Sequence, residues 1–144
     1  LTIHLSGGKK MITSAMAAAQ VIKTKIIGVS VLTSLNDEDA SELFHSTTKA
    51  QVAKLFKLAN ETGIDGIVCS PLELDLAKQI LSPQILKITP GIRDAAANDD
   101  QSRIMTAKEA IKNGASYLVI GRPISQAPSA SEALKYFTQS INEK

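Results

Sequence analysis

Short apolar runs alternate with longer amphipathic segments along the whole chain. The runs predict strands at Leu1–Leu5, Lys25–Leu32, Ile64–Cys69, Gln84–Thr89 and Tyr117–Ile120. The segments between and after them predict helices at Lys9–Ile22, Asp37–Phe44, Thr47–Glu61, from Pro71 onward, from Thr106 to Asn113, and at Ser129–Asn142. This alternation favours parallel βαβ units. The strands are almost continuously apolar, as expected for a sheet covered on both faces.

The predicted helices carry start and stop signals. Thr106 with Glu109 three residues later forms the pattern of a capping box. Gly63 and Gly114 stand where helices should end. The segment Thr33–Asn36 is expected to be a loop.

Length and composition restrict the possible classes of protein. The 144 residues suffice for one domain with a core but are fewer than the roughly 250 of a typical (β/α)8 barrel. A net charge of +2, with Lys and Arg scattered, gives no support for a nucleic-acid or membrane partner. The single Cys69 excludes an internal disulfide and favours a reducing cytoplasm. No signal peptide is expected. Because Leu1 already lies in an apolar run, we expect either further sequence upstream or an unusual start.

Two turns late in the chain carry the candidate chemistry. Each follows an apolar run and combines a glycine with an arginine, Gly91 with Arg93 and Gly121 with Arg122. Glycine lets the backbone approach a ligand, and the planar guanidinium matches a phosphate. The last two strands of a (β/α)8 barrel commonly feed a phosphate site. The sequence therefore predicts a barrel that binds a phosphorylated small molecule, although either arginine could instead be an ordinary surface residue.

Other reactive residues have plainer interpretations. His4 is expected to be a hydrogen-bonded histidine inside the barrel, and Cys69 a small buried residue without a basic partner. His4, His45 and Cys69 lack the spacing of metal ligands, so no metal is expected.

Six segments, in order, resemble the orotidine 5′-phosphate decarboxylase family. They are Thr2-Ile3-His4-Leu5-Ser6-Gly7-Gly8, Val29-Ser30-Val31-Leu32-Thr33-Ser34, Asp65-Gly66-Ile67-Val68-Cys69-Ser70, Thr89-Pro90-Gly91-Ile92-Arg93, Asp100-Gln101-Ser102-Arg103 and Ile120-Gly121-Arg122-Pro123-Ile124. The fourth and fifth together distinguish this family from related sugar-phosphate barrels. The resemblance implies an α/β fold made of the C-terminal five βα units, strands four to eight, of a TIM (β/α)8 barrel of the ribulose-phosphate-binding type. Residues 1–144 would then form a single, incomplete domain.

The resemblance also implies an activity and a set of substrate-binding residues. The family converts orotidine 5′-monophosphate (OMP) to uridine 5′-monophosphate (UMP) and CO2 in de novo pyrimidine biosynthesis, as homodimers and without metal or cofactor. Arg93 would contact the phosphate or ribose phosphate. Gln101 would contact the phosphate and base from a closing loop, or else be an ordinary polar loop residue. Gly121 would offer its backbone N–H and Arg122 its side chain to the phosphate. Thr33 would contact the pyrimidine, or else only help to start the helix that follows it.

The chain departs from the family in its catalytic motif. The family's Asp-x-Lys-x-x-Asp, whose lysine protonates the carbon that loses CO2, occurs nowhere in the sequence. The nearest string, Asp75-Leu76-Ala77-Lys78, has the wrong spacing. We therefore expect no catalytic residue in this chain, no activity from it alone, and either a complementing N-terminal fragment or a truncated product of a longer gene.

Two other functions stay open at this stage. One is a non-catalytic fragment that retains phosphate or nucleotide binding. The other is a different sugar-phosphate TIM-barrel lyase, such as a hexulose-phosphate synthase or a 3-keto-gulonate-phosphate decarboxylase.

Overall fold

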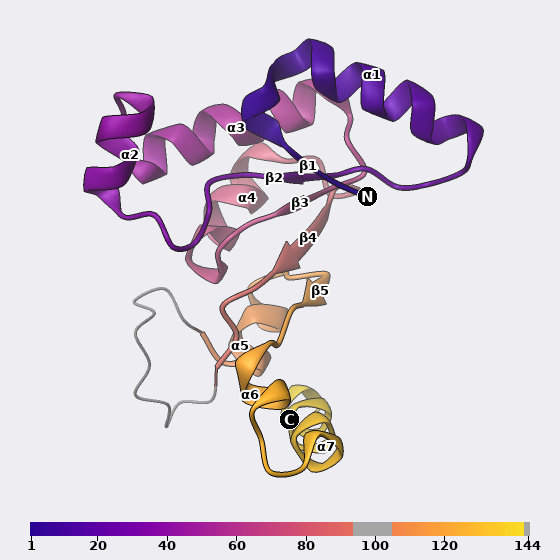
Figure 1. Ribbon diagram of the computed structural model, residues 1–144, viewed down its shortest axis with the longest axis vertical. Helices are drawn as coiled ribbons and strands as arrows, with labels where there is room; N and C mark the ends of the chain where they lie inside the picture. Colours follow the sequence, from indigo (N-terminus) through magenta and orange to yellow (C-terminus); the bar gives the residue numbers. More distant parts are fainter. Residues whose placement is uncertain (94–104, 143–144) are drawn as a thin grey trace.

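Five parallel strands form one sheet in a computed structural model that describes residues 1–93 and 105–142 (Figure 1). The strands are β1 (Thr2–His4), β2 (Ile27–Val29), β3 (Gly66–Val68), β4 (Leu86–Thr89) and β5 (Tyr117–Leu118). They lie side by side in the order of the sequence, β1-β2-β3-β4-β5. A doubly wound sheet would reverse its order at a switch point, so the sequential order is that of consecutive barrel strands.

Helices connect the strands, as the sequence predicts. They are η1 (Leu5–Gly7), α1 (Gly8–Val21), α2 (Asp37–Phe44), α3 (Thr48–Thr62), η2 (Pro71–Glu73), α4 (Leu74–Ile80), α5 (Ala107–Lys112), α6 (Arg122–Ser125) and α7 (Ala130–Asn142). The capping box of Thr106 and Glu109 is confirmed at the start of α5. Gly63 ends α3 in the left-handed conformation that glycine adopts at little cost, with φ of 66°.

One face of the sheet is covered by helices and forms the core. The residues Ile3, Gly28, Ile67 and Lys87 are aligned across β1 to β4 on this face. Gly28 and Lys87 are buried, and Ile67 is fully buried. Ile12 of α1 and Phe56 of α3 are also fully buried, in the same hydrophobic cluster as Ile67. Helices α1 and α3 lie over this end of the sheet (Figure 1).

The opposite face of the sheet is much less covered. His4, Val29, Val68, Ile88 and Tyr117 are aligned across all five strands, and Val119 lies two residues beyond Tyr117. We call these six residues the open face. Val29, Val68 and Ile88 are half-buried, whereas Tyr117 is 60% and Val119 48% exposed. His4 lies on this face, which is the inner face of a barrel, as expected, but its side chain is exposed in the described residues rather than enclosed.

The strands are shorter than the apolar runs that predict them. The run Lys25–Leu32, for example, contributes only Ile27–Val29 to the ladder. Ile26 and Val31, just outside the ladder, are still buried, at 1% and 3% exposure. An apolar run therefore marks burial, while a strand ends where backbone pairing ends.

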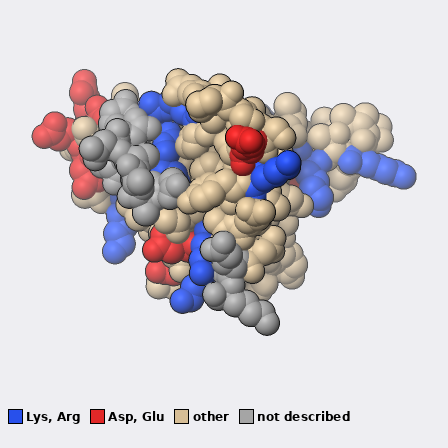
Figure 2. Space-filling view, turned by 90° about the horizontal axis from the view of Figure 1, so that it is seen from below, with Lys and Arg blue, Asp and Glu red and all other residues tan. Residues whose placement is uncertain are grey.

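Charged side chains of both signs are distributed among uncharged ones on the face shown in Figure 2. Within residues 1–93 and 105–142, no helix is long and apolar enough to cross a membrane.

Candidate functional site

The two Gly–Arg turns begin side by side. Strands β4 and β5 pair in parallel, and the Val119 N–H donates to the Thr89 carbonyl at 2.9 Å. Parallel strands end at the same edge of a sheet, so the turn with Gly91 and Arg93 and the turn with Gly121 and Arg122 leave from neighbouring positions. This is the carboxyl edge, where (β/α)8 barrels place their active sites.

The first turn is pinned to the start of the next helix. The Arg93 N–H donates to the Met105 carbonyl at 3.1 Å, and the Met105 N–H donates to the Gly91 carbonyl at 3.4 Å. Gly91 has a φ of 79°, a left-handed conformation that residues with a side chain rarely adopt. These two hydrogen bonds therefore hold the turn against Met105, just before α5 begins.

The Arg93 side chain is more enclosed than a ligand-binding arginine on a surface loop would be. It is 5% exposed, and its Nη1 donates to the Ile92 carbonyl at 2.9 Å. It also lines a hollow of about 170 Å³ between the start of α5 and α7, together with Thr106, Lys108 and Phe137. The geometry gives Arg93 a structural role in holding the turn, and its contact with phosphate stays a prediction.

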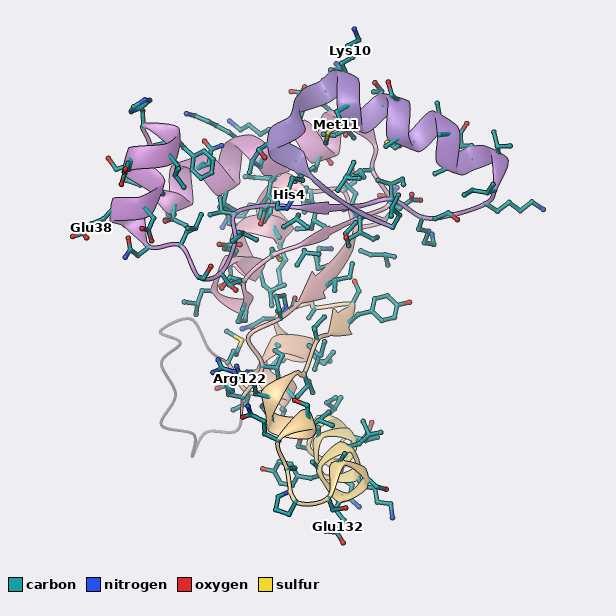
Figure 3. The ribbon with its side chains drawn as sticks, in the orientation of Figure 1. His4, Lys10, Met11, Glu38, Arg122 and Glu132 are labelled. Atoms are coloured by element: carbon teal, nitrogen blue, oxygen red, sulfur yellow. The ribbon has the colours of Figure 1, made fainter. Side chains whose placement is uncertain are left out.

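Arg122 is the first residue of α6, a four-residue helix that the sequence analysis missed. The Ile124 and Ser125 N–H groups donate to the Gly121 carbonyl at 2.9 and 3.0 Å. Pro123 in the first turn of the helix was the available signal, because proline is favoured there. The half-buried Arg122 lies at the start of α6 (Figure 3). Barrel phosphate sites frequently include the start of a short extra helix after the eighth strand, and α6 follows β5 in this way.

Thr33 follows β2, so it also lies beyond the carboxyl edge of the sheet, and it is half-buried. The alternative role of starting the next helix belongs to Asn36 instead. Its Oδ1 accepts from the N–H groups of Glu38 and Asp39 at 2.8 and 2.9 Å, which completes a capping box with Asp39. Thr33 is therefore available for another contact. Gln101 lies outside the described residues.

The turn after β3 is rigid and unreactive. The Glu73 carboxylate accepts from the Ser70 N–H at 2.9 Å in a buried capping box. Cys69 is 1% exposed, as expected. Burial, together with the nearby Glu73 carboxylate, raises the pKa of the Cys69 thiol to about 12, so it is no nucleophile at neutral pH.

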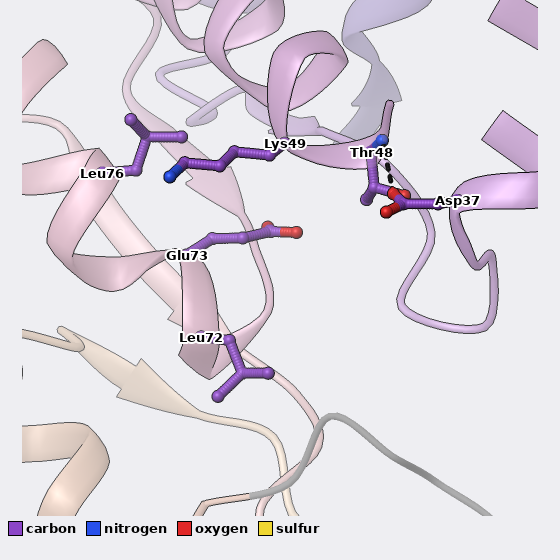
Figure 4. A pocket seen from close by; sticks show the side chains of 6 residues that line it. All are labelled: Asp37, Thr48, Lys49, Leu72, Glu73 and Leu76. Atoms are coloured by element: carbon purple, nitrogen blue, oxygen red, sulfur yellow. Dashed lines mark hydrogen bonds between the residues drawn. The ribbon is translucent and has the colours of Figure 1, made fainter. Parts of the chain in front are cut away.

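A second hollow, of about 320 Å³, lies between the start of α3 and η2–α4 (Figure 4). It is lined by Asp37, Thr48, Lys49, Leu72, Glu73 and Leu76. The Thr48 N–H donates to Asp37 Oδ1 at 2.9 Å, so the chain's own carboxylate already occupies this end of α3. None of the described residues that are expected to bind substrate lines this hollow. Among the described residues, no group of three or more His, Cys, Asp and Glu side chains is placed to hold a metal.

Comparison with known proteins agrees with the family that the sequence resembles. The model of the orotidine 5′-phosphate decarboxylase / HUMPS family matches residues 1–137. The chain is 44% identical over 144 residues to orotidine 5′-phosphate decarboxylase of Wolbachia pipientis (strain wPip), covering 99% of this chain and 64% of that protein. It is 43% identical over 143 residues to the Nitrosomonas europaea protein of the same name, covering 98% of this chain and 62% of the relative.

Structural comparison agrees. The crystal structure of orotidine 5′-phosphate decarboxylase from Lactobacillus acidophilus superimposes with a TM-score of 0.80 at 33% identity, covering 99% of this chain and 62% of that one. The chain thus spans less than two thirds of the length of these relatives, and its five βα units correspond to part of their TIM barrel. The chain belongs to the orotidine 5′-phosphate decarboxylase / HUMPS family.

Proposed function

We propose that this chain supplies the substrate-binding part of an orotidine 5′-phosphate decarboxylase, which converts OMP to UMP and CO2. The observation that carries the proposal is the pairing of β4 with β5, which brings two Gly–Arg turns to one edge of the sheet. In the proposed site, Arg122 and the Gly121 N–H hold the phosphate. Thr33 contacts the pyrimidine, Gln101 closes over the substrate, and Arg93 supports or contacts the phosphate from its enclosed position.

The proposal assigns no proton donor to this chain, because the Asp-x-Lys-x-x-Asp motif is absent from its sequence. The chain alone is therefore inactive in this account, and turnover needs the part of the barrel that contains the motif. The completed enzyme acts as a homodimer in the cytoplasm, without metal or cofactor. The family resemblance supports each of these points, and the single buried Cys69 fits a reducing compartment.

A second candidate function is a different sugar-phosphate lyase. The family description covers both the decarboxylase and HUMPS, so family membership alone does not separate the two. The curated relatives at 40–45% identity are all named orotidine 5′-phosphate decarboxylase, which favours the first function. A substrate panel with OMP and hexulose phosphates tests the choice.

Nucleotide binding can be tested by titration calorimetry with UMP. Replacing Arg122→Ala should weaken binding by about 1.5–3 kcal/mol, the range for a lost hydrogen bond to a charged group. The matched control is Lys112→Ala. It also removes one positive charge, but from the exposed last turn of α5, which leads to the opposite edge of the sheet.

The comparison of the two variants decides the role of Arg122. Weaker UMP binding in Arg122→Ala but not in Lys112→Ala supports the proposed phosphate contact. Equal affinities of both variants and the wild type would remove Arg122 from the site.

A further inference from the structure

The hollow between the start of α3 and η2–α4 is separate from the proposed substrate site (Figure 4). Its volume of about 320 Å³ lies within the range of small-ligand pockets, about 300–1,000 Å³. Its wall combines two carboxylates, a lysine, a threonine and two leucines, contributed by α2, α3, η2 and α4. A pocket with a few polar groups beside an apolar surface can orient a small amphipathic molecule.

The Glu73 carboxylate is the buried charge of this hollow. Glu73 is 8% exposed, and its Oε2 accepts from the Ser70 N–H at 2.9 Å. This capping box fixes the side chain in the turn after β3. A carboxylate has about four lone-pair sites, so Glu73 can accept from a donor in the hollow in addition to the chain's own donors.

The Thr48 hydroxyl is a second polar group of the wall. Thr48 is 4% exposed, and its Oγ1 has no hydrogen-bond partner among the described residues. A buried hydroxyl without a partner lowers stability, so a partner from outside the chain would offset this cost. Threonine in a helix has two accessible χ1 rotamers, and rotation about χ1 turns Oγ1 toward a ligand in the hollow.

The charges of the wall favour a cation over an anion. The Thr48 N–H at the start of α3, which could attract an anion, already donates to Asp37 Oδ1 at 2.9 Å. Asp37 and Glu73 bring two negative charges, against the single positive charge of the exposed Lys49. A monovalent cation therefore neutralises the wall.

The apolar part of the wall favours an aliphatic body on that cation. Leu72 is 57% exposed, although Pro71 and Glu73 on either side of it in η2 are buried. Leu76 of α4 is half-buried and lines the same hollow. The two leucines thus offer a carbon surface beside the buried carboxylate, where a short hydrocarbon chain can leave water.

We propose that this hollow binds a small primary alkylammonium ion. An ammonium group has three N–H donors, of which one bonds to the Glu73 carboxylate and another to Thr48 Oγ1. The carbon chain lies against Leu72 and Leu76, and Asp37 adds attraction from the rim. The binding site follows from the wall of the hollow alone, so it stands whether or not the completed enzyme decarboxylates OMP.

NMR titration of the 144-residue chain with n-butylammonium chloride tests the proposal. The buffer contains about 0.15 M NaCl, which screens attraction to exposed surface charges beyond about 8 Å. The expected result is saturable shifts of the Thr48 and Glu73 amide signals, with a Kd on the order of 1 mM, as suits a ligand of five non-hydrogen atoms. Methylammonium has the charge without the chain and should bind at least about fivefold more weakly. n-Butanol and butyrate lack the positive charge and should not bind.

Four variants locate the site. Glu73→Gln removes the charge but keeps an oxygen for the Ser70 N–H, and Thr48→Val removes the hydroxyl. Each should weaken butylammonium binding at least about fivefold. Glu61→Gln removes the same charge from the exposed far end of α3 and should leave the affinity unchanged. Lys49→Ala removes a repelling charge and should tighten binding, whereas a site for anions would respond in the opposite way.

Circular dichroism of each variant should match the wild type. Thr48→Val keeps the test decisive even if Glu73→Gln does not fold, because the hydroxyl it removes has no partner among the described residues.

Three results would overturn the proposal. The first is the absence of saturable shifts at Thr48 and Glu73 with butylammonium. The second is n-butanol or butyrate binding as tightly as butylammonium, or weaker butylammonium binding in Lys49→Ala. The third is an affinity that is the same in Thr48→Val as in the wild type, or that falls as much in Glu61→Gln as in Glu73→Gln, which would indicate only attraction to surface charge. These readouts need no catalysis, so they do not depend on the proposed activity.

Discussion

Gly28 offers a quantitative test of how the sheet packs against its helices. It lies in the middle of β2 on the helix-covered face. A Cβ added there would stand 2.4 Å from Leu5 Cδ2, 2.7 Å from Leu5 Cγ and 3.1 Å from Ile64 Cδ1. Leu5 is fully buried and Ile64 is 1% exposed, so neither side chain can move aside into solvent. Gly28→Ala therefore adds a methyl group where the core has no room.

The expected cost follows from two opposing terms. Inserting a methyl group into a packed core costs about 1–3 kcal/mol. Gly→Ala also restricts the unfolded chain, which stabilises the folded state by about 0.4–1 kcal/mol. The two ranges leave a net loss in the free energy of unfolding of roughly 0–2.6 kcal/mol. Because the added Cβ would stand 2.4 Å from the fully buried Leu5 side chain, we expect the upper half of this range, about 1.3–2.6 kcal/mol.

Gly7→Ala is the matched control. Gly7 has helical φ and ψ of −67° and −10°, and its added Cβ would meet only Met11, mainly the end of its side chain. Met11 is 39% exposed and flexible, so it can rotate away (Figure 3). This variant should be neutral or more stable by up to about 1 kcal/mol, since only the unfolded-state term applies.

Urea unfolding followed by circular dichroism measures both variants against the wild type. The account predicts a lower midpoint for Gly28→Ala and an equal or higher one for Gly7→Ala, with similar slopes. If Gly28→Ala matched the wild type within 0.5 kcal/mol, roughly the size of ordinary surface effects, the assignment of the covered face would be refuted.

Four further predictions concern single side chains. Asn36→Ala should destabilise α2 by about 1 kcal/mol through loss of its cap, measured as faster amide exchange in that helix and not in α3. Thr48→Val replaces a buried hydroxyl that has no hydrogen-bond partner among the described residues, and should leave urea stability equal or raise it by about 1 kcal/mol. Cys69 should resist a thiol reagent in the native chain at pH 8 and react only in urea, given its pKa of about 12; rapid native labelling would contradict its burial. Hydrogen bonds from Thr106 lower the pKa of Glu109 in the folded state. The stability that these bonds contribute is therefore present above the ordinary carboxyl pKa and is lost as the pH falls through the lowered value. Glu109→Gln should reduce the loss of stability between pH 7 and pH 3, and an unchanged pH profile would contradict this.

The sequence predicts most of the architecture because helices and strands here are decided locally. The capping box of Thr106 and the helix-ending Gly63 depend on neighbouring residues only, and both are confirmed. The extent of each strand depends on its pairing partner, which is why the run Lys25–Leu32 yields a ladder of only Ile27–Val29.

The site was harder to predict where it depends on distant contacts. The surroundings of Arg93 involve residues distant in sequence: its N–H donates to the Met105 carbonyl, and it lines a hollow together with Phe137 of α7. The exposure of His4 follows from the uncovered edge at β1, which no local pattern records. By contrast, Pro123 beside Arg122 was a local signal for α6, and it could have been used.

Release of labelled CO2 from carboxyl-labelled OMP tests the central claim most directly. The assay compares three samples: the chain alone, the unmatched part of the wPip relative alone, and the two together. The account predicts no release from either part and release from the mixture, which Arg122→Ala should reduce and Lys112→Ala should not. A mixture that forms a complex yet releases no CO2 would contradict the proposed decarboxylase function. Release from the chain alone would instead contradict the claim that this chain supplies no proton donor.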